Sequence, residues 1–445
     1  MLPGVRERGR FVKIALIAMS GVRAHSEELT RLGMTLPGFV ERSRVIASLP
    51  SLSLLTLAGM TPERFDLEYF EIADLRALGS LPECDLAAIS TFSAQVNDAY
   101  EVADRYRALG VTTVMGGLHV TALPHEALRH ADAVVTGEGE LSWPQLLSDF
   151  ENAKLQRLYE PGGRQFDLAE APLPRYDLID PAKYNRLTVQ TQRGCPWRCD
   201  FCASSILLSP RYKVKPVPKT INEVRSIRSV WPRPFVEFAD DNTFVNKKHS
   251  RQLMRAMAHE DVRWFAETDV SVADDPELLS LMREAGCAQV LIGFESPNAA
   301  GLDGIELNRN WKSHRGNEYK AAIERIQSHG IAVIGCFVLG LDGDTPDVFE
   351  QVKRFVDESG LFQVQITVLT AFPGTPLHAR LEREGRIIHA DSWERCTLFD
   401  VNFVPKQMSV SQLEQGLIAL GTELYSADAS KRRARAFRQQ ARLYA

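Results

Sequence analysis

The chain has 445 residues, of which 44% are hydrophobic and 24% are charged, and its formal net charge is -5. This balance excludes a general electrostatic attraction to nucleic acid or to an anionic membrane. No apolar run is long enough to cross a bilayer, and the N-terminus lacks the pattern of a cleavable signal, so we expect a cytoplasmic protein without a membrane span. The length predicts two or three structural units with sizeable cores.

The first third of the chain alternates between apolar runs and helical patterns. Runs typical of buried strands cover residues 12–19, 65–72, 85–90, 111–117 and 131–137. Helical stretches such as residues 97–109 separate them, which indicates a parallel sheet with helices on both faces. We therefore predict an α/β, Rossmann-like domain at residues 11–150, followed by a Pro- and Gly-rich linker at 151–186.

A second series of strands and helices begins near residue 187. Its candidate strands are residues 187–192, 235–240, 263–270, 288–296, 332–340 and 362–370. Six strand and helix pairs are too few for a closed eight-fold barrel, so we predict a partial (β/α)6 barrel at residues 187–386, with its chemistry at the C-terminal ends of the strands. Residues 387–445 predict a mostly helical capping segment. We interpret its basic run KRRARAFRQQAR as a solvated helix face rather than a nucleic-acid contact.

Three of the seven cysteines are crowded into the stretch RGCPWRCDFC, at the spacing CxxxCxxC. Cys195, Cys199 and Cys202 follow the first strand of the second series, on the face where a parallel barrel carries its chemistry. A disulfide framework is the poorer explanation for an odd number of cysteines in a chain without an export signal. Three thiolates are one short of the usual four around zinc or an iron–sulfur cluster, and a [4Fe-4S] cluster held in this way has one iron free for a substrate.

The stretch RGCPWRCDFC resembles the cluster motif of the radical S-adenosylmethionine enzymes, in which an aromatic residue, here Phe201, precedes the last cysteine. The resemblance covers residues 187–386 and implies that Cys195, Cys199 and Cys202 hold a [4Fe-4S] cluster. It also implies that the free iron binds S-adenosylmethionine, that one electron cleaves it to a 5′-deoxyadenosyl radical, and that the backbone of Phe201 lies against the adenine. An electron donor such as flavodoxin or ferredoxin is implied as a partner.

Further matches to this family occur at the ends of the predicted strands. The resemblance implies that S-adenosylmethionine contacts Asp240, Asp241, Asn242, Glu267, Glu295, Ser296, Pro373 and Gly374. Carboxylate and carbonyl oxygens are suitable partners for the methionine ammonium group. Tyr212, shortly after the cysteines, and Glu295 are the candidates for a catalytic acid or base near the substrate.

The first domain is similar to the cobalamin-binding domains that precede the barrel in a large subgroup of these enzymes. Small residues after its strands would allow a ligand to approach closely. The resemblance implies a cobalamin-like cleft at Ser90, Thr91, Gly116, Gly117 and Gly137. The DxHxxG loop, whose histidine ligates cobalt in many cobalamin proteins, is absent. For His25 and His119 a structural role is favoured over cobalt ligation, and whether cobalamin is bound stays open.

Two reactions remain open for a small-molecule substrate, a natural-product intermediate or a metabolite. The resemblance favours cobalamin-dependent C-methylation after hydrogen abstraction. The alternative is a cobalamin-independent dehydration, deoxygenation or rearrangement of a sugar such as an aminoglycoside intermediate. A cluster-bearing sensor and a tRNA-methylthiolating enzyme are disfavoured, because the sequence shows neither a fourth cysteine close to the motif nor a second cysteine set in the first domain.

Overall fold

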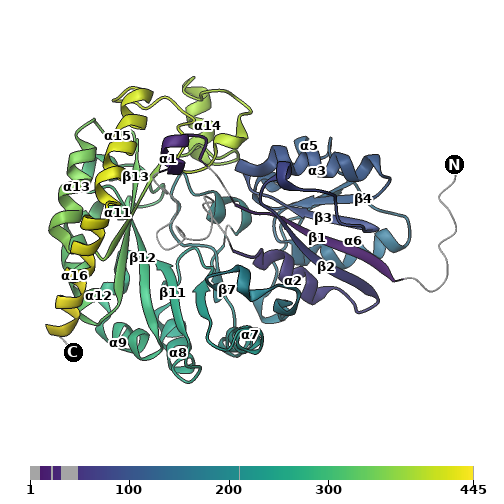
Figure 1. Ribbon diagram of the computed structural model, residues 1–445, viewed down its shortest axis with the longest axis horizontal. Helices are drawn as coiled ribbons and strands as arrows, with labels where there is room; N and C mark the ends of the chain where they lie inside the picture. Colours follow the sequence, from purple (N-terminus) through teal and green to yellow (C-terminus); the bar gives the residue numbers. More distant parts are fainter. Residues whose placement is uncertain (1–10, 22–23, 32–48, 210, 444–445) are drawn as a thin grey trace. The chain divides into compact units, whose positions relative to one another are not determined.

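The computed structural model describes residues 11–21, 24–31, 49–209 and 211–443, which fall into two compact units (Figure 1). The first unit contains residues 11–20, 51–166 and 172–179. The second contains residues 167–171 and 180–443 and the described residues among 21–50. None of the helices in these residues combines the length and the hydropathy that a membrane span requires. The predicted boundaries of the linker and of the capping segment stay predictions.

The strands of the first unit are all parallel and lie in the order β2-β1-β3-β4-β5-β6. Their bounds are β1 Val12–Met19, β2 Phe65–Ile72, β3 Leu86–Ser90, β4 Thr112–Gly116, β5 Ala133–Val135 and β6 Leu158–Tyr159. The helices are α2 Leu52–Met60, α3 Val96–Ala108, α4 Leu118–Ala122, α5 Pro124–Ala127 and α6 Trp143–Glu151. The predicted Rossmann-like alternation is therefore confirmed.

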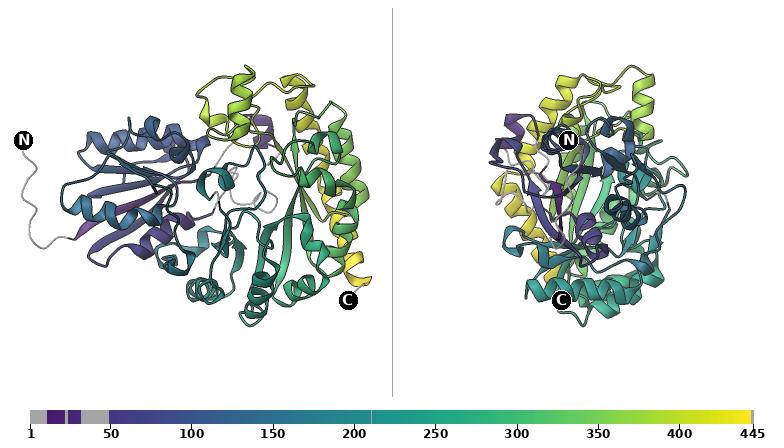
Figure 2. Two further views of the ribbon diagram at one scale, coloured as in Figure 1. Left: turned by 180° about the vertical axis from the view of Figure 1, so that it is seen from behind. Right: turned by 90° about the vertical axis from the view of Figure 1, so that its right-hand side faces the viewer.

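The core of the first unit is built on β1, whose neighbours on either side are β2 and β3. Leu16 packs on one face with Leu54 of α2 and Trp143 of α6. Ile17, the next residue, is also fully buried and points to the opposite face. Helices lie on both sides of this sheet in Figure 2. An interior strand that is apolar on both faces accounts for the unbroken run VKIALIAM.

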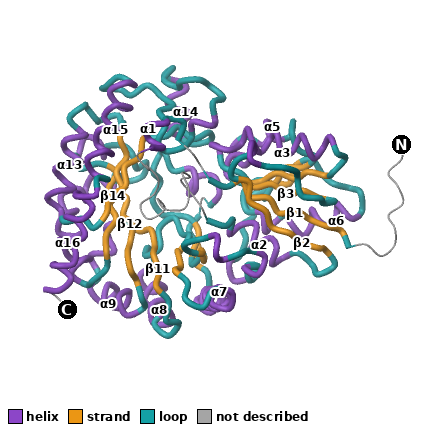
Figure 3. The backbone as a smooth tube through the Cα atoms, in the orientation of Figure 1, coloured by secondary structure: helices purple, strands orange, loops and turns teal. Residues whose placement is uncertain are grey.

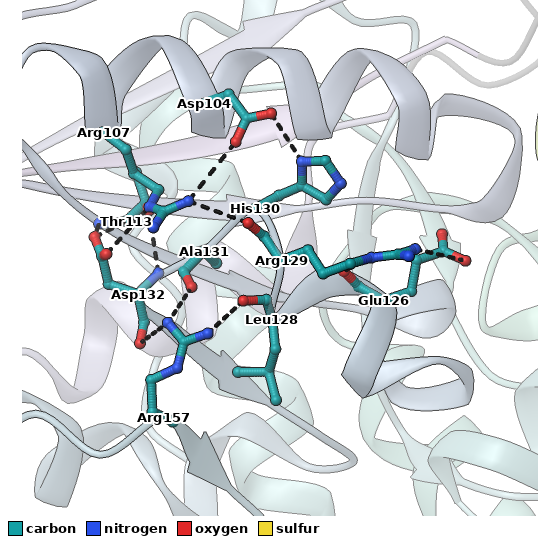
Figure 4. A network of polar contacts seen from close by, with 10 residues as sticks. All are labelled: Asp104, Arg107, Thr113, Glu126, Leu128, Arg129, His130, Ala131, Asp132 and Arg157. Atoms are coloured by element: carbon teal, nitrogen blue, oxygen red, sulfur yellow. Dashed lines mark hydrogen bonds and ion pairs between the residues drawn. The ribbon is translucent and has the colours of Figure 1, made fainter.

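A polar network holds the turn between α5 and β5 (Figure 4). Asp132 accepts hydrogen bonds from the backbone nitrogen of Thr113 (2.9 Å) and from the guanidinium of Arg107 (3.2 Å). Arg157 donates to the carbonyl oxygen of Leu128. These bonds connect the turn to α3, to β4 and to the residue that precedes β6.

We expect Asp132→Ala to destabilise the first unit by about 1–3 kcal/mol, because the buried backbone N–H of Thr113 loses its acceptor. A urea titration of the full-length protein followed by circular dichroism measures this. Arg129→Ala is the matched control, because Arg129 belongs to the same network but is exposed, and an exposed ion pair contributes little. Equal unfolding midpoints for the two variants would contradict the assigned role of Asp132.

The strands of the second unit's main sheet are also all parallel and follow the chain in the order β14-β13-β12-β11-β10-β7. Their bounds are β7 Leu187–Val189, β10 Phe235–Phe238, β11 Arg263–Thr268, β12 Cys287–Glu295, β13 Ala332–Leu339 and β14 Gln363–Val368. A separate antiparallel pair is formed by β8 Gln192–Arg193 and β9 Lys213–Val214, which come between β7 and β10 in the chain. All six predicted strands are confirmed, in the order expected of a partial (β/α)6 barrel.

Helices flank these strands on the outer side, as Figure 3 shows for α8, α9, α13 and α16. The helices of the unit are α1 Glu27–Arg31, α7 Val217–Val230, α8 Lys247–Met257, α9 Pro276–Glu284, α10 Ala299–Leu302, α11 Trp311–Arg315, α12 Tyr319–Ser328, α13 Val348–Ser359, α14 Pro376–Arg383, α15 Val410–Leu424 and α16 Ala427–Leu443. The helical character of the C-terminal region is confirmed. In its basic run Arg432, Arg435 and Arg438 are exposed, whereas Arg433 is buried and donates to the Leu424 carbonyl (2.8 Å).

The two faces of the second sheet differ in polarity. Phe238 and Trp264 are fully buried on the helix-covered face, where their rings stack at 4.7 Å. Since side chains alternate along a strand, Glu237 and Glu267 lie on the opposite face. This second face is acidic, so it is suited to hold a ligand rather than to form an apolar core.

Candidate active site

The three cysteines of the motif lie in one loop, residues 194–203, which we call the cluster loop. It leads from β8 into a short π-helix, Ser204–Leu208. Gly194 opens the loop at φ +81°, and a Cβ here would lie 2.7 Å from the carbonyl oxygen of Ser209. Only glycine adopts this conformation without strain, so Gly194 allows the backbone turn with which the loop begins.

Burial raises the pKa of all three cysteine thiols, that of Cys195 to about 11. The charge of Cys202 adds to the rise in pKa at Cys195 and at Cys199. The sulfurs therefore lie near one another. In the described ranges no three His, Cys, Asp or Glu side chains converge on a single metal ion. A [4Fe-4S] cluster does not require such convergence, because each cysteine binds a different iron of the cube. Buried thiols that become thiolates only with a metal fit such a cluster.

The residues after β10 hold the cluster loop by its backbone. Asp240 is buried and accepts hydrogen bonds from the backbone nitrogens of Thr191 (2.8 Å) and Gln192 (3.0 Å), just before the loop. Asp241 accepts one from the backbone nitrogen of Gly194 (2.9 Å). Burial raises the pKa of Asp240 to about 6, against the effect of these hydrogen bonds. The structure thus brings both predicted carboxylates to the cluster loop.

Asn242, also predicted from the sequence, lies between the cluster loop and the end of β11. Its amide nitrogen is 2.7 Å from the carboxylate of Asp269 and 3.8 Å from the sulfur of Cys195. The same carboxylate accepts the indole N–H of Trp197, a cluster-loop residue, at 2.8 Å. Sequence reasoning missed Asp269, although it follows the predicted strand-end residues directly.

Glu295, at the end of β12, has the left-handed φ of +62° and forms an ion pair with Lys312. The Lys312 ammonium also donates to the carbonyl oxygen of Gly293 (2.9 Å). Burial raises the pKa of Cys199, and the positive charge of Lys312 opposes that rise. The pair therefore lies close enough to the cluster loop to act on it. Lys312 was not predicted, because no motif marks it.

Glu267 is accessible from the polar face of the sheet although protein surrounds it. This enclosure, together with the carboxylates of Glu237 and Asp241, raises the pKa of Glu267 to about 7. Glu237 has its charge balanced by Arg186. Glu267 can consequently gain or lose a proton near neutral pH.

A segment far along the chain braces the other side of the cluster loop. The backbone nitrogen of Leu307 donates to the Arg198 carbonyl (2.8 Å), and that of Asp200 donates to the Ile305 carbonyl (2.9 Å). Between them the buried carboxylate of Glu306 accepts the backbone N–H of Arg198 (3.2 Å). Sequence reasoning missed Glu306, which carries no recognisable signal.

The helix that follows the predicted residues Pro373 and Gly374 contacts the cluster loop. Pro373 and Gly374 precede α14, whose Leu377 donates its backbone N–H to the Asp200 carbonyl (3.0 Å). Arg380 of the same helix donates to the Asp200 carboxylate (3.1 Å). The end of the barrel is thus connected to its beginning through this loop.

Three other predicted residues lie in the same region. Tyr212 donates its hydroxyl to the side-chain oxygen of Gln192, and burial raises the pKa of Tyr212 to about 12. It therefore supports the strand that enters the cluster loop. Phe201 is half-buried directly before Cys202, and Ser296 is fully buried after Glu295.

The predicted cofactor residues of the first unit follow neighbouring strands. Ser90 ends β3 and pairs in register with Gly116, which ends β4. Gly117 has φ +108°, and a Cβ there would lie 2.6 Å from the carbonyl oxygen of the buried Thr91. Gly137, at φ +65°, follows β5. Small residues side by side at one sheet edge fit a bulky cofactor, because the backbone can approach it.

Neither isolated histidine is placed as a cobalt ligand. His119 is fully buried, and its ring nitrogens lie 3.1 Å from the Ser93 hydroxyl and 3.3 Å from the Glu126 carboxylate. His25 belongs to the second unit, where its backbone nitrogen donates to Asp400 (2.9 Å). Both ring nitrogens of His119 therefore have protein partners, whereas the His25 side chain is exposed and its role stays a prediction.

Comparison with known families and proteins agrees with both units. The sequence pattern of the Radical SAM superfamily matches residues 189–356, and that of the B12 binding domain matches residues 49–147. A domain of unknown function, DUF4070, matches residues 375–444. The Radical SAM match implies S-adenosylmethionine and a [4Fe-4S] cluster as cofactors, and the B12 match supports cobalamin as a third.

Two curated proteins are similar over most of the chain. Bacteriochlorophyllide d C-12(1)-methyltransferase of Chlorobaculum tepidum is 28% identical, covering 86% of this chain and 84% of that protein. Hopanoid C-2 methylase of Rhodopseudomonas palustris is 28% identical, covering 79% of this chain and 67% of that protein.

Solved structures show the same fold. TsrM from Kitasatospora setae, with cobalamin and a [4Fe-4S] cluster bound, superposes with a TM-score of 0.66 at 15% identity, covering 98% of this chain and 100% of that chain. OxsB, a cobalamin-dependent S-adenosylmethionine radical enzyme, gives a TM-score of 0.67 at 13% identity, covering 94% of this chain and 66% of that chain. The two domain matches, at residues 189–356 and 49–147, place the chain in the radical S-adenosylmethionine superfamily, in the group whose barrel follows a B12-binding domain.

Proposed function

We propose that this enzyme transfers a methyl group to a carbon atom of a small-molecule substrate with the help of cobalamin. The observation that carries the proposal is the cluster loop, in which carboxylates at the ends of parallel strands hold three enclosed thiols in place. Methyl transfer in particular is supported by the similar proteins, which are named as a methyltransferase and a methylase.

In this proposal Cys195, Cys199 and Cys202 hold the [4Fe-4S] cluster. Asp241 and Glu267 supply acceptors for the ammonium group of S-adenosylmethionine, since neither forms an ion pair with a described Lys, Arg or His, and both face the same polar region. When bound, the cluster and S-adenosylmethionine supply the radical that takes hydrogen from the substrate, and cobalamin supplies the methyl group.

The remaining side chains set the charge of the site. Lys312 neutralises Glu295 next to Cys199, so a negatively charged cluster does not face an uncompensated carboxylate. Glu267 holds a proton at its carboxyl group in part of the molecules near neutral pH. An electron donor of the flavodoxin or ferredoxin type, and the cytoplasmic location, stay predictions.

Radical dehydration, deoxygenation or rearrangement of a sugar without cobalamin is the weaker candidate. It needs no cofactor in the first unit, yet that unit matches the B12 binding domain and carries small residues at one sheet edge. The substrates named for the relatives belong to those proteins, and our proposal for this chain stops at a small molecule.

Changing Cys195, Cys199 or Cys202 to alanine is expected to remove most of the iron from anaerobically reconstituted protein, together with the cleavage of S-adenosylmethionine. Iron analysis and the amount of 5′-deoxyadenosine formed measure the two effects. Cys84→Ala is the matched control, because Cys84 lies in the first unit and should leave both unchanged. A triple alanine variant that keeps the iron of the native protein would refute the ligand assignment.

Reconstitution with excess cobalamin, followed by gel filtration, is expected to leave cobalt as well as iron on the chain. Gly117→Ala should lose cobalt, since the new Cβ would lie 2.6 Å from the Thr91 carbonyl oxygen at the proposed cleft. Gly110→Ala is the matched control, because Gly110 also has a positive φ but open space around it. Iron without cobalt on the native protein would make dehydration or rearrangement the better-supported reaction.

His119→Gln is expected to leave the visible spectrum of bound cobalamin unchanged, because both ring nitrogens of His119 already have protein partners. The spectrum of a cobalt–histidine complex would change when the ligand is removed. A shifted absorption maximum in the variant would therefore show that His119 moves to the cobalt, against this prediction.

A further inference from the structure

The side chain of Asn242 is fully engaged in the interior of the site. It is 3% exposed, and its amide nitrogen lies 2.7 Å from the Asp269 carboxylate and 3.8 Å from the Cys195 sulfur. Its amide oxygen accepts from the backbone nitrogen of Asp269 (3.2 Å) and from the hydroxyl of Thr268 (3.4 Å). Each polar atom of the amide thus has its own partners.

These partners fix which way the amide points. A backbone N–H can only donate, so the atom of Asn242 that faces the nitrogen of Asp269 must be the oxygen. The amide nitrogen then has to face the Asp269 carboxylate and the sulfur of Cys195. One N–H is directed to each, and the orientation is not interchangeable.

Asp269 is an anchored, ionised carboxylate. Burial opposes its ionisation, but donors from Ser271, Asn242 and Trp197 outweigh this effect and lower the pKa of Asp269. The backbone nitrogen of Ser271 lies 2.8 Å from one carboxylate oxygen, and the indole nitrogen of Trp197 lies 2.8 Å from the other. Asp269 therefore holds Asn242 and the cluster loop in one fixed relation.

A second donor faces another cysteine of the loop. The hydroxyl of Ser205 lies 3.1 Å from the sulfur of Cys202. Two of the three cysteines are thus approached by hydrogen-bond donors that belong to the protein. Hydrogen bonds to cluster sulfurs stabilise the extra negative charge of the reduced cluster, and so they raise its reduction potential.

We propose that Asn242, positioned by Asp269, donates a hydrogen bond to the cluster-bound thiolate of Cys195 and raises the reduction potential of the cluster. This role rests on the proposed function, in which Cys195 is a cluster ligand. It differs from the contact with S-adenosylmethionine expected from the sequence, because the structure commits the amide to protein partners. Asn242 and Asp269 are positioning residues that act through the cluster.

The test is a redox titration of full-length, anaerobically reconstituted protein, without S-adenosylmethionine, followed by electron paramagnetic resonance of the reduced cluster. Asn242→Ala is expected to hold the iron of the native protein but to show a more negative midpoint potential. Asn242→Ser, which keeps a small polar group beside Asp269 but does not reach the sulfur, should shift the potential in the same direction. Ser205→Ala should do so independently.

Asn298→Ala is the matched control, since Asn298 is an asparagine of the same unit whose amide bonds Gln351 (2.8 Å) and the backbone nitrogen of Gly301 (2.7 Å) instead of a cysteine. Its midpoint potential should equal that of the native protein. An unchanged potential in both Asn242 variants overturns the proposal, as does an equal shift in Asn298→Ala. Loss of the cluster from both Asn242 variants also overturns it, because the role is then structural. A native protein that holds no cluster refutes the proposed function instead.

Discussion

The geometry of the site depends on buried carboxylates that accept hydrogen bonds from the backbone around the cluster loop. Asp240 and Asp241 hold the strand that enters the loop and its first residue, and Glu306 holds its middle from the opposite side. Each backbone N–H has one hydrogen to donate, so a carboxylate that accepts it fixes that part of the backbone. These bonds fix the course of the loop and, with it, the positions of its three cysteines.

Charge balance is the second constraint on the barrel. Three acidic side chains, the buried Glu237 and Glu295 and the accessible Glu267, lie on one face of a parallel sheet, where bare carboxylates repel one another. Arg186 and Lys312 neutralise two of them. The third keeps a pKa near neutrality, so the face tolerates a cationic ligand without carrying a large negative charge of its own when empty.

The strands, the order of the units and the position of three cysteines in one loop could be predicted, because each follows from local spacing: an apolar run, a strand–helix period, or CxxxCxxC. Lys312, Glu306 and Asp269 could not. Each acts through a contact between segments far apart in the chain, and a single Lys, Glu or Asp carries no pattern. For Asn242 the strand end was predicted correctly, whereas its partners depend on how β10 and β11 lie side by side.

The chain path between the units has a consequence for how such proteins can be rearranged. After β1 the chain leaves the first unit, contributes α1 to the second, and returns at Ser51. The first unit is therefore built from separate segments of the chain and not from one continuous segment. A gene fusion or recombination event that moved the first unit alone would separate it from the segment that carries α1 and the His25–Asp400 hydrogen bond, so the two units should be inherited together.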